Sequence, residues 1–130
     1  MKKNLYISIL FLLFGNLLFA QGLEFQSLTC NYQTNPIAID SEQPLLSWIV
    51  KAEGFNREQT AYQVLVASQP QLLNEKEADF WNSGKVKGAQ SAHVKYRGKK
   101  LVPIQKYWWK VKIWDEKGEA SDWSPTNTFE

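Results

Sequence analysis

The stretch YWWKVKIWD, residues 107–115, decides the fold of this chain. Read at a period of two, one face consists of aromatic and branched apolar side chains, and on the other face two tryptophans flank two lysines. The first face holds Tyr107, Trp109, Val111 and Ile113, and the second holds Trp108, Lys110, Lys112 and Trp114. Successive side chains of an extended chain point to opposite sides, so the pattern predicts a half-buried β-strand. We expect the first face to build a core and the outer tryptophans to need a cover of their own.

Turn signals and further alternating segments surround this strand. The cluster from Asp115 to Gly118 predicts a tight turn, after which residues 123–129 can return as a hairpin partner. Upstream, apolar residues alternate at 25–32, 45–52 and 60–68, with shorter extended pieces near 85–86 and 92–96 and a short helical or irregular link at 70–78. The side chains expected to face inward are Leu28, Cys30 and Tyr32, then Leu46, Trp48 and Val50, then Tyr62, Val64 and Val66. Six or seven short strands with a turn about every ten residues are typical of an antiparallel β-sandwich, so we expect an all-β fold.

The approach to the 107–115 strand narrows this fold class. Leu101, Pro103 and Tyr107 have the spacing Leu-x-Pro-x-x-x-Tyr, which resembles the entry into the sixth strand of fibronectin type III domains. In such a tyrosine corner the ring packs in the core and the hydroxyl bonds backbone in the preceding connection. Together with Trp48 on the second expected strand, this spacing favours a fibronectin type III or immunoglobulin-like sandwich.

The first twenty residues have the features of a signal peptide. Lys2 and Lys3 provide a basic start, an apolar run follows at residues 5–18, and Ala20 offers a small residue for cleavage. The apolar run is shorter than the roughly 20 residues that a membrane span needs. We therefore expect a cleavable signal peptide at 1–20 and a β-sandwich at 21–130, exported to the periplasm or outside the cell and without a membrane anchor after cleavage.

Charge and cysteine content limit the functions open to the remaining chain. Without residues 1–20 it has 13 basic and 13 acidic residues, so no basic excess points to nucleic acid. Its length suits one domain with one core. Cys30 is the only cysteine, so the domain has no internal disulfide, and we expect the thiol to be a small buried apolar group.

The titratable residues do not form a pattern typical of catalysis. Glycoside hydrolysis needs two rigid carboxyl groups that face each other across a sugar, about 5–10 Å apart. The nearest candidates all fall in expected turns, where solvated or turn-capping roles are common; they are Asp40, Glu42, Asp79, Asp115 and Glu116. His93 has neither a second histidine nor a cysteine nearby, so an exposed or packed ring is expected. The sequence therefore predicts no catalytic residue, no metal site and no cofactor.

The two outer tryptophans are the candidate functional residues. Trp108 and Trp114 are six residues apart on one strand face, roughly 20 Å at the usual rise per residue. Three roles remain open, namely stacking on the apolar faces of sugar rings, packing beneath a neighbouring domain, and cover by lysine or arginine stems. The lysine-rich second half of the chain could attract acidic glycans, but protection of edge strands from aggregation is the favoured role.

Three blocks of sequence resemble one family. NPIAID at 35–40 leads into PLLSW at 44–48, QTAYQVLVAS follows at 59–68, and DFWNSGKV at 79–86 precedes the strand at 107–115. In this order they are similar to the N-terminal module of bacterial α-L-rhamnosidases. The resemblance implies a fibronectin-like domain that leads a multidomain glycosidase, whose catalytic acid and base reside in a later (α/α) barrel and remove terminal rhamnose with inversion.

The expected function follows from this resemblance. No family catalytic residue can be carried over, because the barrel is not in this sequence. We expect a non-catalytic accessory module of an exported α-L-rhamnosidase, whose partners are the downstream domains of the same parent chain. The alternative is a standalone carbohydrate-binding or adhesion module, with rhamnose-containing polysaccharide as its partner. A reading frame that continues past residue 130 would favour the first.

Overall fold

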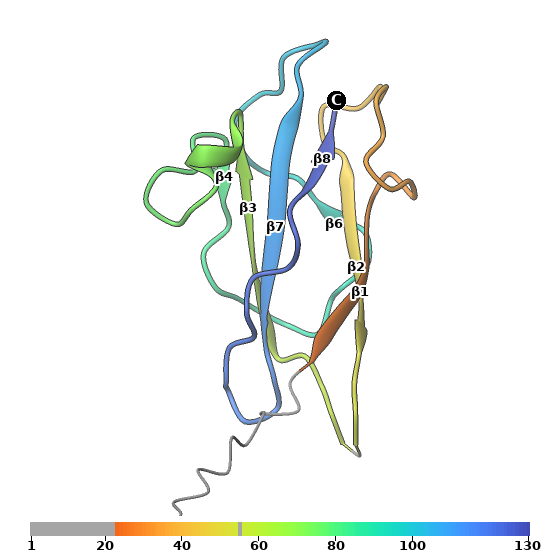
Figure 1. Cartoon of the computed structure of the whole chain (residues 1–130), viewed down its shortest axis with the longest axis vertical. Coiled ribbons are helices and arrows are strands. Elements are labelled where there is room, and N and C mark those ends of the chain that lie inside the picture. Colours follow the sequence, from red (N-terminus) through yellow and green to blue (C-terminus); the bar gives the residue numbers. More distant parts are fainter. Residues whose placement is uncertain (1–22, 55) are drawn as a thin grey trace, which may run out of the picture.

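The computed structural model describes residues 23–54 and 56–130 and shows a sandwich of two antiparallel sheets (Figure 1). The elements are β1 (Glu24–Cys30), β2 (Leu45–Lys51), β3 (Ala61–Ala67), the 3-10 helix η1 (Pro70–Leu72), β4 (Trp81–Asn82), β5 (Val86–Lys87), β6 (Val94–Lys95), β7 (Tyr107–Trp114) and β8 (Asn127–Phe129). The smaller sheet has the order β1-β2-β6, and the larger has the order β4-β3-β7-β8 with β5 also paired to β3. The predicted all-β, immunoglobulin-like sandwich is confirmed. The predicted signal peptide lies outside the described residues, among which no helix is long and apolar enough to cross a membrane.

The core forms between the inner faces of the two sheets. β7 pairs with β3 from Trp108 opposite Ala67 to Trp114 opposite Ala61. This register turns the predicted inner face of β7 toward the smaller sheet, and it agrees with the alternation read from the sequence. The buried residues of the main core are Leu28, Cys30, Leu46, Trp48, Tyr62, Val64, Val66, Val94, Tyr96, Tyr107, Trp109, Val111, Ile113 and Phe129.

The predicted tyrosine corner is present. The hydroxyl oxygen of Tyr107 accepts a hydrogen bond from the backbone N–H of Val102 at 2.8 Å. The ring itself is buried between Phe80, whose centroid is 4.7 Å away, and Phe129, at 5.4 Å. The corner therefore joins the 99–106 connection to the core at the start of β7.

The first strand is shorter than predicted. It ends at Cys30, and Tyr32 is 73% exposed rather than directed inward. Asn31 and Tyr32 both adopt a left-handed backbone, with φ of 47° and 67°, because the chain reverses there through paired backbone hydrogen bonds between Cys30 and Gln33. The inward prediction for Tyr32 was wrong because this turn breaks the alternation.

Cys30 has the buried position that the sequence predicts. Burial raises the pKa of its thiol to about 12, because the surrounding core solvates a thiolate poorly. The thiol therefore stays protonated near neutral pH, and the thiolate is the reactive form of cysteine. Cys30 acts as an apolar packing group.

Gly98 sits where the chain has room for no side chain. A Cβ atom there would lie 2.5 Å from the Tyr96 hydroxyl and 2.6 Å from the Cβ of Trp81, and it would also collide with the Phe80 carbonyl. The Tyr96 hydroxyl donates a hydrogen bond to the carbonyl of Lys99 at 2.6 Å, which holds this turn against the core.

We predict that Tyr107→Phe lowers the free energy of unfolding by about 1–2 kcal/mol, because the part-buried N–H of Val102 loses its acceptor. Urea unfolding measures the change. Tyr32→Phe is the control, since that ring is exposed, and its effect should stay within about 0.5 kcal/mol. Equal losses in the two variants would contradict the role of the corner.

Gly98→Ala should lower the free energy of unfolding by about 3 kcal/mol, because the new methyl group meets backbone and a buried hydroxyl. The matched control is Gly118→Ala, where φ is 76° but a Cβ would meet nothing within 4 Å. Backbone strain alone should cost the control about 1 kcal/mol. A control as unstable as Gly98→Ala in thermal unfolding would show that the close contact is not the cause.

Candidate functional site

The outer face of the larger sheet carries a layer of stacked lysines and tryptophans, which we call the tryptophan–lysine face. It comprises Trp108, Lys110, Lys112 and Trp114 of β7 together with Trp123 and, at its borders, Lys85 and Lys106. The distances from ammonium nitrogen to ring centroid are 4.7 Å for Lys85 and Trp114, 5.6 Å for Lys106 and Trp108, 5.0 Å for Lys110 and Trp123, 5.3 Å for Lys112 and Trp114, and 4.6 Å for Lys112 and Trp123. A cation over an indole face is attracted by the ring quadrupole, so each lysine is held where it lies.

Trp123 reaches this layer through a pair of serines that the sequence analysis missed. The backbone N–H of Val111 donates to Ser124 Oγ at 3.0 Å, and the N–H of Ile113 donates to Ser121 Oγ at 3.1 Å. In return the N–H groups of Ser124 and Ser121 donate to the carbonyls of Val111 and Ile113, both at 2.8 Å. Residues 121–124 thus line the edge of β7 before β8 begins, and they place Trp123 over the lysines. The sequence SDWS at residues 121–124 was the signal from which these serine contacts could have been predicted.

Burial and one ion pair set the electrostatics of this face. Burial lowers the pKa of Lys110, because the ammonium group is partly removed from water. Lys112 Nζ lies 3.3 Å from Glu75 Oε1, which reaches over from the segment after η1. The lysines are therefore largely occupied by partners within the chain.

The predicted pair, Trp108 and Trp114, occupies the outer face as expected. Both rings are half-buried, and Trp108 also packs against a second apolar cluster of Leu65, Ala67 and Leu73. Of the three roles left open by the sequence, cover by lysine has contacts in the structure, where the ammonium nitrogens of Lys106 and Lys112 lie over Trp108 and Trp114. Sugar stacking and domain packing stay predictions for these two residues.

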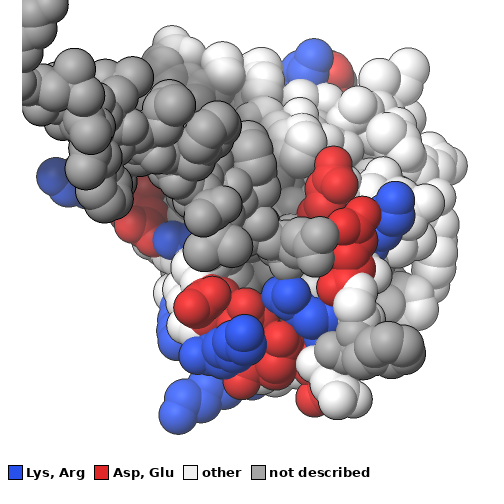
Figure 2. Space-filling model, turned by 60° about the horizontal axis from the view of Figure 1, so that its bottom comes forward, with Lys and Arg blue, Asp and Glu red and all other residues white. Residues whose placement is uncertain are grey.

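The acidic candidates serve as turn and capping groups. Asp115 Oδ1 accepts from the N–H groups of Lys117 and Glu119, both at 2.9 Å, and its other oxygen lies 3.4 Å from Arg57. Glu116 lies 3.1 Å from the Nε of the same arginine, and its pKa is lowered by its own backbone N–H, by the N–H of Glu58 and by the arginine. Figure 2 shows acidic and basic side chains interspersed at this lower end of the sandwich.

The remaining titratable candidates lie away from Asp115 and Glu116. Asp79 accepts hydrogen bonds from the backbone and side chain of Ser68 at the end of β3. Asp40 and Glu42 are exposed on the 31–44 connection. His93 is exposed, as predicted, with its ring 5.2 Å from Tyr32. Within the described part of the chain, no three such groups come together in a way that could hold a metal ion.

The sequence matches a known domain family over almost all of the described chain. Residues 25–130 match the model described as Rha78A-like, N-terminal immunoglobulin domain. An α-L-rhamnosidase of Formosa agariphila is 50% identical over 109 residues, which make up 84% of this chain and 11% of that relative. The chain thus spans about a tenth of the length of this relative.

Solved structures agree with this match. The α-L-rhamnosidase of Streptomyces avermitilis, solved with L-rhamnose, superimposes with a TM-score of 0.79 and 38% identity over 84% of this chain and 10% of its own. The enzyme of Dictyoglumus thermophilum gives a TM-score of 0.77 and 40% identity over 82% of this chain and 12% of its own. The resemblance seen in the sequence is confirmed, and the chain belongs to the family of N-terminal immunoglobulin domains of Rha78A-like α-L-rhamnosidases.

Proposed function

We propose that this chain is a non-catalytic accessory module of an exported α-L-rhamnosidase, and that it packs against and positions downstream domains that release terminal rhamnose from glycans. One observation carries the proposal: a relative that is 50% identical over the 109 matched residues is an α-L-rhamnosidase about nine times as long as that matched segment. The basic start and apolar run at residues 1–20 support export to the periplasm or beyond.

The contacts of the acidic residues support a role without catalysis. Asp79 and Asp115 are the two most enclosed of the candidate acids. Asp115 accepts hydrogen bonds from two backbone N–H groups of its own turn, and Asp79 accepts one from the N–H of Ser68, directly after β3. A glycosidase instead needs one carboxyl group as acid and a second as nucleophile or base, on opposite sides of a bound sugar. In the described residues these carboxylates act as caps of local structure.

The experiment compares this chain with the product of the reading frame continued past codon 130. We expect the longer product to release p-nitrophenol from p-nitrophenyl α-L-rhamnopyranoside and the 130-residue chain to release none. Rhamnose release by the short chain would show that it is itself an enzyme. A stop directly after codon 130 would favour the standalone alternative.

The alternative function is binding of rhamnose-containing polysaccharide through Trp108 and Trp114. Two half-buried indoles on one sheet face favour it. Against it, lysine ammonium groups already lie over both rings.

We therefore predict that wild type and the double variant Trp108→Ala, Trp114→Ala migrate equally in affinity gels that contain such a polysaccharide. Circular dichroism checks that the variant is folded, and Tyr32→Ala serves as an exposed aromatic control. Retardation of wild type and of the control, but not of the double variant, would establish sugar binding at this face.

A further inference from the structure

One end of the sandwich exposes apolar side chains. The 31–44 connection, the 99–106 connection and the end of β8 meet there, at the top of Figure 1. We call this surface the apolar end and define it by Ile37, Val102 and Ile104, which are 82%, 53% and 93% exposed. They are three of the five large apolar residues that are exposed in the described chain. Exposed apolar groups that gather at one place mark a contact surface.

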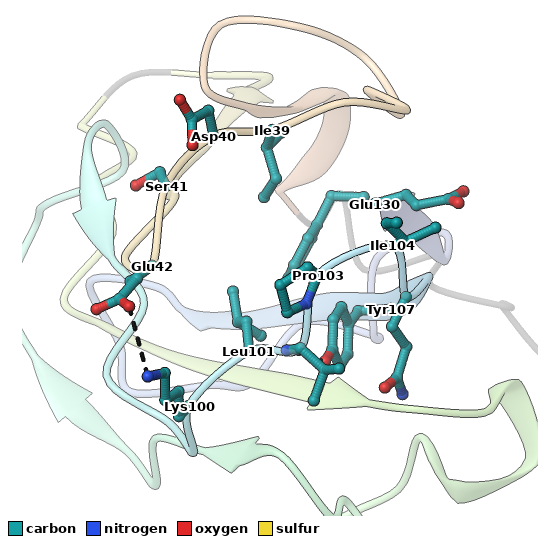
Figure 3. Close-up of a pocket in the computed structure, with 13 residues that line it drawn as sticks. Ile39, Asp40, Ser41, Glu42, Lys100, Leu101, Pro103, Ile104, Tyr107 and Glu130 are labelled. Carbon is teal, nitrogen blue, oxygen red and sulfur yellow. Dashed lines mark hydrogen bonds and ion pairs between the residues drawn. The ribbon is translucent and has the colours of Figure 1, made fainter.

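A cavity of about 440 Å³ opens at this end, and Val102 and Ile104 line it. Its apolar lining also includes Ile39, Leu101, Pro103, Tyr107 and Phe129, and the ion pair of Glu42 and Lys100, 3.7 Å apart, lies at its border. Figure 3 shows Ile39 and Leu101 pointing into this space from two different connections. Such a pocket, apolar within and charged at its border, suits one large apolar side chain from a partner.

Ile104 has a backbone conformation that is unusual for its residue type. Its φ is 61°, in the left-handed region that β-branched residues avoid, and its side chain is almost fully exposed. Asparagine or glycine would adopt this conformation with less strain. Residues with a strained backbone cluster at functional sites, so Ile104 is a candidate contact residue for a partner.

The end of β8 is held firmly beside this surface. The N–H of Glu130 donates to the carbonyl of Pro36 at 3.0 Å, and the carbonyl of Glu130 accepts from the N–H of Ile39 at 2.8 Å. On its other side β8 pairs with β7, where Phe129 lies opposite Tyr107. Any chain that continues past Glu130 therefore starts from a fixed point and in a fixed direction, next to the cavity.

We propose that the apolar end is the docking surface for the domain that follows residue 130, and that an apolar side chain of that domain fills the cavity. This rests on the proposed function. The matched family is an N-terminal domain in chains about nine times longer, so the rest of such a chain leaves from this end. Two other surfaces described above have partners within the chain, since the lower end pairs Arg57 with acidic side chains and the tryptophan–lysine face stacks lysines on its own rings.

The test uses the full-length product and the variant Ile104→Asn, with Ile49→Asn as matched control. Ile49 is 58% exposed but lies on β2, away from this end. In the full-length protein we expect Ile104→Asn to raise the rate of proteolytic cleavage after the module about ten-fold, because the domain contact opens more often. In the 130-residue chain the same variant should raise the melting temperature, because asparagine relieves the strain.

The outcomes separate this inference from the proposed function. In one outcome, Ile104→Asn resists cleavage as well as wild type does, while Trp108→Ala or Trp114→Ala is cut rapidly. The docking site would then be the tryptophan–lysine face, and this inference alone would be wrong. If wild type and Ile104→Asn are both cut rapidly at the junction, the module does not pack against the following domain. That result would contradict both proposals.

Discussion

β7 pairs with β3 along all seven residues of β3, and this ladder organises both faces of the larger sheet at once. Its inner residues, among them Trp109 and Ile113, complete the core against the smaller sheet. Its outer residues include Lys110 and Lys112, whose ammonium groups lie over the ring of Trp123. A slip of one residue would exchange the two faces, placing lysines in the core and core residues in water. With a single cysteine in the sequence, no internal disulfide can secure the register, so the burial of these alternating side chains has to do so.

The surfaces of the module differ in how many of their charged and apolar side chains have partners within the chain. At the lower end, Arg57 pairs with Asp115 and Glu116, and on the outer sheet face the lysines lie over indole rings. At the apolar end, Val102 and Ile104 contribute large exposed side chains to the lining of an open cavity, and Glu130, the residue after β8, is clamped next to it. A domain that positions its neighbours needs an exposed apolar surface for contact and a rigidly held end from which the chain continues. Both features occur at the same place in this structure.

Much of this fold could be predicted because its signals are local. The alternation of β7 and the spacing of Leu101, Pro103 and Tyr107 each lie within a few residues, and the structure confirms both. The features that could not be predicted depend on hydrogen bonds of turns and loops, which hydrophobic alternation does not encode. Tyr32 turns outward because Cys30 bonds to Gln33, and Asn31 is held by Leu45. The serine contacts that place Trp123 and the clamp between residues 36–39 and Glu130 are likewise hydrogen bonds of loop residues, and the left-handed backbone of Ile104 has no counterpart in the hydrophobic pattern. For the candidate site, the sequence placed Trp108 and Trp114 on one outer face. It did not reveal that Lys85 lies over Trp114, or that Trp123 stacks with Lys112.

Hydroxyl-radical footprinting tests most directly whether this module acts by docking at its apolar end. The same residues are compared in the 130-residue chain and in the full-length product. We expect Ile37, Val102 and Ile104 to be strongly protected in the full-length protein, while labelling of Trp108 and Trp114 stays the same. Equal labelling of the three apolar residues in both proteins would contradict it.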